Sequence, residues 1–163
     1  MGVKAADFGS IVVMVEFAPA LPPHEVTEWS DDDDCFMFKR RQPSATDKVG
    51  CGGDMVIFRS SDRSGEFTLK FFQTSPTNKY LNTGLELMEA EDASVFVPIS
   101  ISFIDTNRQD AILGLQGYVK QVPDIARGKD AKVQEWTIVV DKSSVSLGDP
   151  VFAAFIAAAA AGQ

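Results

Sequence analysis

Short segments in which apolar and polar residues alternate constrain the fold of this chain more than any other feature. In the segment 66–74, Phe67, Leu69 and Phe71 alternate with polar residues such as Thr68. Alternation with a period of two puts the apolar side chains on one face of a strand, so it predicts a half-buried β-strand. The sequence predicts six or seven strands, from the candidate segments 8–17, 35–40, 55–59, 66–74, 96–104, 112–122 and 133–140.

One segment has helical rather than strand periodicity. Ser75 is a favourable N-cap residue, and Pro76 suits the first position of a helix. Leu81, Leu85 and Met88 follow at the spacing of one helix face. We expect a helix over 76–90 that packs on the strands. The chain is therefore predicted to be mainly β, a sandwich or barrel with one packed helix.

The connections between strands are identified by turn residues. The cluster at 60–65 predicts a turn that joins 55–59 to 66–74 as a hairpin, with Gly65 supplying a positive φ. The polar segment 41–47, which contains a proline, predicts a loop, and the glycine-rich residues 50–53 predict a turn.

Length and composition fit one globular domain. The chain has 163 residues, of which 45% are hydrophobic and 23% charged, close to the average of folded domains. We expect a single domain over 1–150 and an apolar tail over 151–163. The tail is too short to span a bilayer, and no membrane association is expected. It either docks as a helix on its own domain or is buried against another subunit.

The sequence lacks the residue combinations that carry most chemistry. Its only histidine is His24, and no nucleotide-binding loop or nucleophile elbow occurs. Cys35 and Cys51 with one histidine do not make a zinc site, and either a single bridge or two unpaired thiols is compatible with them. We therefore expect no catalytic residues, no metal and no cofactor. The net charge of −8 argues against a protein that grips nucleic acid.

Several short motifs follow one another in a specific order over residues 29–147. The most informative are SDRSGE at 61–66 and QTSPTN at 73–78. They are supported by residues 40–41, 44–50, Thr68, 117–119, 123–124, 128–129 and 135–136. In this order and spacing the sequence resembles the tail tube proteins of contractile-tailed bacteriophages. Cys51 departs from that pattern, because a small residue such as alanine is expected in the glycine-rich turn.

The resemblance implies a structural role in a virion tail assembled in the host bacterial cytoplasm. Members form homohexameric rings that stack into a hollow tube, through which the genome is ejected without specific DNA binding. The implied partners are further copies of the chain and the sheath, tape measure, baseplate and tail terminator proteins. The alternatives are a baseplate tube initiator, a tube protein like that of type VI secretion, and a monomeric ligand-binding β-sandwich.

Three groups of residues are candidates for the contacts that such an assembly needs: basic residues, a turn pair and apolar residues of the tail. Basic residues in an acidic chain set register between subunits, or else form a solvated loop. Asp62 and Arg63 are explained by turn chemistry or by an intersubunit salt bridge. The candidates for inter-subunit contacts are Arg40, Arg41, Lys48, Asp62, Arg63, Phe152, Phe155 and Ile156.

An acidic run precedes the second predicted strand. Four adjacent carboxylates repel one another, so a solvated loop is the simplest interpretation. The alternatives are lining of a tube lumen, a calcium site and pairing with basic residues of a neighbouring subunit; the EF-hand pattern is not met. The residues of this acidic loop or lumen candidate are Glu28, Asp31, Asp32, Asp33 and Asp34.

Overall fold

The computed structural model of the chain describes residues 8–90 and 96–148. The described part begins with a short 3-10 turn at Phe8–Ser10 and contains nine strands and one α-helix. In chain order these are β1 (Ile11–Glu16), β2 (His24–Glu25), β3 (Phe36–Arg40), β4 (Ala45–Val49), β5 (Met55–Arg59), β6 (Gly65–Phe72), α1 (Pro76–Met88), β7 (Ile99–Asp105), β8 (Asp110–Gln121) and β9 (Val133–Ser146). The predicted class, mainly β with one helix, is confirmed.

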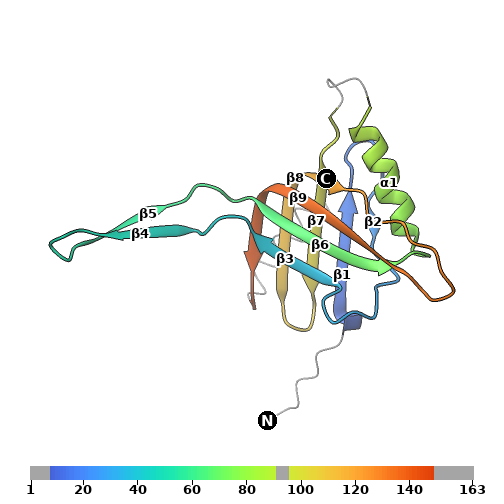
Figure 1. The fold of residues 1–163 in the computed structure, drawn as a ribbon, viewed down its shortest axis with the longest axis horizontal. Coiled ribbons are helices and arrows are strands. Elements are labelled where there is room, and N and C mark those ends of the chain that lie inside the picture. Colours follow the sequence, from blue (N-terminus) through green and yellow to red (C-terminus); the bar gives the residue numbers. More distant parts are fainter. Residues whose placement is uncertain (1–7, 91–95, 149–163) are drawn as a thin grey trace, which may run out of the picture.

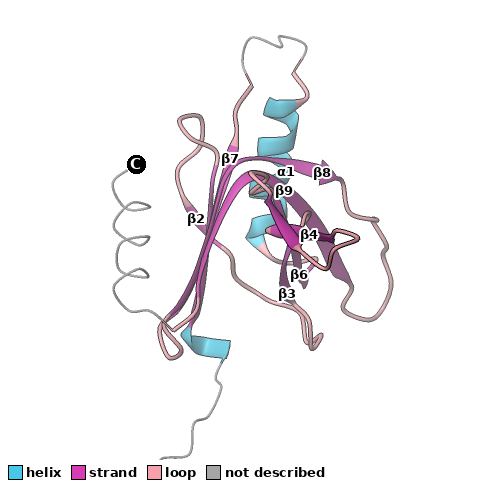
Figure 2. Ribbon diagram, turned by 90° about the vertical axis from the view of Figure 1, so that its left-hand side faces the viewer, coloured by secondary structure: helices cyan, strands magenta, loops and turns pink. Residues whose placement is uncertain are grey.

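Seven of these strands form one antiparallel sheet. Its order is β2-β1-β7-β8-β9-β6-β3, so β2 and β3 are the edges and the long strands β8 and β9 lie in the middle. The sheet bends strongly, and α1 lies within the bend (Figure 2). The strands predicted at 96–104 and 112–122 are found as β7 and β8, which pair with each other as an antiparallel hairpin.

The core lies on the face of the sheet that α1 covers. Phe67, Leu69 and Phe71 of β6 are fully buried there, as their alternation predicts. Trp136 of β9 is also buried, and its ring nitrogen donates a hydrogen bond of 3.0 Å to Asn78 Oδ1 of the helix. The helix therefore packs on the sheet through both apolar and polar contacts.

The predicted start of the helix is confirmed. Ser75 is the N-cap, and its hydroxyl accepts a hydrogen bond from the backbone N–H of Thr77. The same hydroxyl donates to the carbonyl of Thr27 at 2.7 Å, which ties the helix start to the preceding loop. The helix ends at Met88, two residues before the predicted end.

The prediction for residues 41–65 is wrong in its pairing. Residues 45–47, expected within the loop at 41–47, belong to β4, and β4 pairs with β5 through the turn at 50–53. The strand at 55–59 therefore does not form a hairpin with β6, which pairs instead with β3 and β9. The turn-like residues 60–65 connect two separate sheets.

Gly65 has a different role from the predicted one. Positive φ values occur at Gly53 and Gly148 among the described glycines, and not at Gly65. Gly65 lies in β6, where a Cβ atom would come within 2.5 Å of the Phe38 ring. A side chain at this position would displace the Phe38 ring, so close packing against β3, and not backbone conformation, favours a glycine there.

Candidate assembly surface

A long β-hairpin projects from the body of the molecule. We call residues 41–60, which contain β4 and β5, the arm; Figure 1 shows it extending away from the seven-stranded sheet. All ten residues of its two strands are exposed. At the base of the arm, the N–H of Ser60 donates to the carbonyl of Ser44 at 2.9 Å. At its tip, Gly53 has a φ of +87°, which suits the tight turn.

The arm exposes large apolar side chains. Val56, Ile57 and Phe58 lie next to one another in sequence, and each is more than half exposed. Val49 and Met55, opposite each other near the tip, are exposed to 64% and 59%. Exposed large apolar side chains clustered in this way mark an interaction site in a folded protein.

Sequence reasoning missed these apolar residues because it placed 55–59 in the main sheet. The run Met-Val-Ile-Phe does not alternate, unlike the half-buried strands elsewhere in the chain. A strand without alternation next to a glycine-rich turn was the available signal for a hairpin with two apolar faces.

The three predicted basic residues are spread along the arm, two at its base and one near its tip. Arg40 ends β3, and its guanidinium donates a hydrogen bond of 3.3 Å to the Ser44 hydroxyl. Arg41 is exposed at the start of the arm. Lys48 in β4 places its ammonium 6.0 Å from the centre of the Phe58 ring, within range of a cation–π contact.

Asp62 and Arg63 connect the arm to the sheet. The Asp62 carboxylate accepts a hydrogen bond of 2.8 Å from the N–H of Ser64, and hydrogen bonding to Ser64 lowers the pKa of Asp62. The carbonyl of Arg63 accepts from both the N–H and the hydroxyl of Ser143 in β9, at 2.9 and 2.6 Å. Local turn chemistry thus explains Asp62, and the backbone of Arg63 anchors the end of the arm.

The acidic loop lies beside β6, and its four aspartates at 31–34 are exposed. Asp32 is 3.9 Å from the ammonium of Lys70, which is itself 4.0 Å from Glu135. Ion pairs at such surfaces contribute little to stability. Glu28 lies apart from this group, where its carboxylate accepts a hydrogen bond of 2.6 Å from the Thr74 hydroxyl.

The two cysteines are unpaired thiols. Cys35 is buried, and desolvation raises the pKa of its thiol, with Asp32 and Asp34 acting in the same direction. Cys51 is exposed in the turn at the tip of the arm. Of the two alternatives that the sequence left open, the structure supports unpaired thiols.

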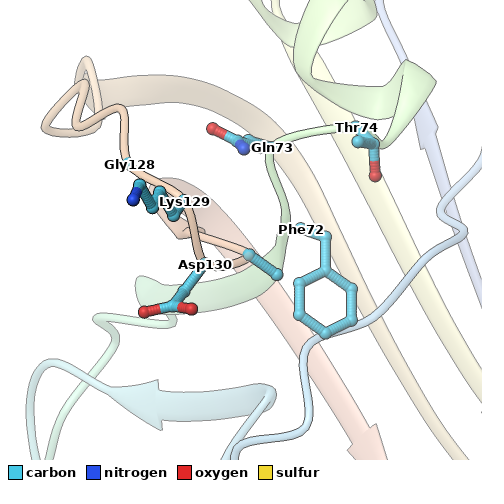
Figure 3. A pocket seen from close by; sticks show the side chains of 7 residues that line it. Phe72, Gln73, Thr74, Gly128, Lys129 and Asp130 are labelled. Carbon is cyan, nitrogen blue, oxygen red and sulfur yellow. The ribbon is translucent and has the colours of Figure 1, made fainter.

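A surface groove of about 360 Å³ lies where β6 leads into α1. It is lined by Phe72, Gln73, Thr74 and residues 128–131 (Figure 3). Arg127 donates a hydrogen bond of 2.9 Å to the Gln73 side chain beside it. The groove is open, whereas small-molecule sites are mostly enclosed and apolar.

The part of the chain that the structure describes contains neither a cluster of metal ligands nor a membrane-spanning helix. Within 8–90 and 96–148, no three or more histidine, cysteine, aspartate or glutamate side chains gather as metal ligands would. Across the same residues, no helix is both long enough and apolar enough to cross a membrane. Phe152, Phe155 and Ile156 lie outside the described residues, as does the whole segment 149–163.

These features define a class of protein: a bent antiparallel sheet with one docked helix and a projecting hairpin arm. The chain belongs to the family of the bacteriophage PhiTE tail tube protein, whose model matches residues 30–148. The predicted resemblance is therefore confirmed. No curated protein sequence matches the chain.

Solved structures with the same fold come from contractile injection systems. One is the tube-terminating cap of the anti-feeding prophage, with a TM-score of 0.55 and 13% identity over 90% of this chain and 95% of that one. A second is the sheath–tube complex of the extracellular contractile injection system PVC, with a TM-score of 0.51 and 12% identity over 88% and 92%. A third is the anti-feeding prophage baseplate, with a TM-score of 0.53 and 9% identity over 91% and 99%.

Proposed function

We propose that this protein is the subunit of a phage tail tube. Homohexameric rings of it stack into a hollow tube inside a contractile sheath, and the genome is ejected through that tube. The match of residues 30–148 to a tail tube family carries the proposal. The exposed apolar arm supports it, because such a surface calls for a partner.

The edges of the sheet provide the contacts within a ring. β2 and β3 end the seven-stranded sheet, so each leaves one side of its backbone without a strand partner in the described chain. Strand edges readily pair with strands of another chain, and closure of a ring removes them. We propose that neighbouring subunits pair at these edges and form a continuous inner β-barrel.

The arm provides the contacts between rings. Arg40, Arg41 and Lys48 lie on the arm or at its base, where they can pair with carboxylates of an adjacent ring. Such complementary charges fix the register of one ring on the next more than they add affinity. We extend the same role to Asp62 and Arg63 and to the apolar tail over 151–163, with Phe152, Phe155 and Ile156.

The charge of the chain suits a conduit for DNA. A net charge of −8 in each copy gives a ring that repels phosphate instead of holding it. Salt screens this repulsion beyond about 8 Å, so DNA passes without specific binding. In this proposal, acidic side chains from the set Glu28 and the aspartates at 31–34 line the lumen.

The partners and location follow from the same role. We propose contacts with the sheath, the tape measure, the baseplate and the tail terminator proteins of the same virion. The protein is assembled in the host cytoplasm, becomes part of the virion tail and needs no catalytic residue, metal or cofactor.

A second candidate has the same fold. The structural neighbours include a tube-terminating cap and a baseplate, so a protein that caps or initiates a tube is the main alternative. The two functions differ in whether rings of the protein stack without limit.

Negative-stain electron microscopy of the purified protein, with light scattering on the same sample, tests the proposal. We expect long hollow tubes, or six-fold rings at low concentration. Rings that never stack favour the cap or initiator. A stable monomer at high concentration and at every salt concentration contradicts a tube function.

A further inference from the structure

Both faces of the arm carry exposed apolar side chains, mainly from β5. In the ladder of β4 and β5, Asp47 pairs with Ile57 and Val49 with Met55, so these four side chains share one face. The intervening pairs present Val56 and Phe58 on the opposite face. Ile57 and Phe58 are exposed to 59% and 52%, so neither face is covered by the described part of the same chain.

Both faces of such a hairpin must pack against other protein surfaces to be buried. A two-stranded hairpin alone is at best marginally stable in water. A strand that lies on a single surface has one apolar face and one polar face, as β6 of the main sheet does. The non-alternating segment Met55–Arg59 therefore indicates two opposed partner surfaces.

The charges of the chain indicate that the partner is the same protein. The arm carries three basic residues, Arg41, Lys48 and Arg59, and two acidic ones, a net charge of +1, which becomes +2 when Arg40 at its base is included. The remaining residues therefore carry a net charge of −10, which together with +2 gives the total of −8. A basic arm on an acidic body is complementary to other copies of itself and makes a head-to-tail contact.

We infer that the arm of one subunit is inserted at the boundary between two neighbouring copies in the next ring, with one face against each copy. A flat surface on one subunit covers one face of a hairpin, whereas two adjacent subunits supply opposed walls. The inference rests on the proposed tube function and adds a stoichiometry: each arm joins three subunits.

Thiol labelling of the full-length chain tests this geometry. The parent is Cys51→Ser, which removes the exposed thiol and leaves Cys35 buried. Ile57→Cys and Phe58→Cys then report on the two faces separately. Each variant is added as a minority to the parent protein, so that tubes form even where the substitution weakens the contact. The parent alone, and each variant kept unassembled at low concentration, are the controls.

We expect both positions to react with a maleimide in the unassembled protein and both to lose that reactivity in tubes. If tubes form and one position still reacts as in the unassembled protein, the arm lies on a single surface and the inference is overturned, although the tube function stands. If neither the parent nor the unaltered chain forms rings or tubes, the proposed function itself is contradicted, and the inference with it.

Discussion

At the residue scale, the helix and the loop after β1 approach each other closely at Gly84. Gly84 of α1 faces the ring of Phe17, which is fully buried, and a Cβ atom at Gly84 would overlap that ring. Glycine disfavours helix formation, yet it occupies this helical position because a larger side chain would overlap the Phe17 ring.

We predict that Gly84→Ala destabilises the protein despite the better helix propensity of alanine. Overpacking against a buried ring costs about 1–3 kcal/mol, and the overlap of a Cβ atom with the Phe17 ring places this site toward the upper end, above the gain in propensity of about 1 kcal/mol. Urea unfolding measures the change. Lys79→Ala, at an exposed position of the same helix, is the control and should change the free energy of unfolding by less than about 0.5 kcal/mol. An equally stable or more stable Gly84→Ala protein would refute the close contact.

A second prediction concerns Asp62. Its pKa is lowered in the folded state by hydrogen bonding to Ser64, so the folded protein favours the charged carboxylate. The resulting contribution to stability is present above the pKa of the unfolded state. It is lost as the pH falls through the lower pKa of the folded state.

Comparison of the unaltered protein with Asp62→Asn tests this sign. Denaturant midpoints measured from pH 7 down to pH 3 should show a small deficit of the variant at neutral pH that shrinks as the pH falls. A deficit that grows toward low pH would contradict the assignment.

At the scale of elements, the arm and the body are separate units of packing. No residue of β4 or β5 belongs to the buried core cluster, whereas β1, β6, β7, β8 and β9 all contribute to it. The hydrogen bond between Ser44 and Ser60 brings the two ends of the arm together at its base.

We predict that the body folds without the arm. Residues 45–59 can be replaced by Asn-Gly, which suits a two-residue hairpin turn between Ser44 and Ser60. Because no core residue is removed, the free energy of unfolding should stay within about 1 kcal/mol of that of the full chain. Circular dichroism and urea unfolding measure it. The same variant should lose the ability to stack rings, and unfolding on removal of the arm would show that the two units are not separate.

The elements that the sequence predicted correctly are those with a buried face. The strands at 66–74 and 133–140 and the N-cap at Ser75 carry their own local signals, and all three are found as β6, β9 and the start of α1. Burial of one face imposes alternation, and capping imposes residue type, so both are visible in the sequence.

The elements that the sequence did not predict lack such a signal. β4 is polar and fully exposed, and β2 has two residues. The last six residues of β9, from Asp141 to Ser146, are mostly polar, so the strand was predicted to end too early. These six residues are held in β9 by pairing with β8, and a pattern in the local sequence carries no information about such a distant partner. The arm was missed because the exposed strand β4 has no buried face and so no alternation, although basic residues on the arm and at its base were identified as contact candidates.

At the scale of the whole molecule, the charge distribution makes a prediction about nucleic acid. The chain carries −8, and the basic residues of the arm are too few to form the phosphate-binding surface that nucleic-acid affinity needs. We expect no retardation of duplex DNA in a gel-shift assay at physiological salt, by either the free subunit or its assemblies. Salt-dependent binding of DNA would contradict a lumen that repels phosphate.

The central claim is that the chain builds a hollow tube from stacked rings. Cryo-electron microscopy of the assembled, full-length protein tests it most directly, because a reconstruction reports the symmetry, the lumen and the position of the arm together. The account predicts a six-fold tube with an open lumen and with the arm of each subunit in contact with the next ring. A fibre without a lumen, or a protein that stays monomeric under every condition of assembly, would contradict it.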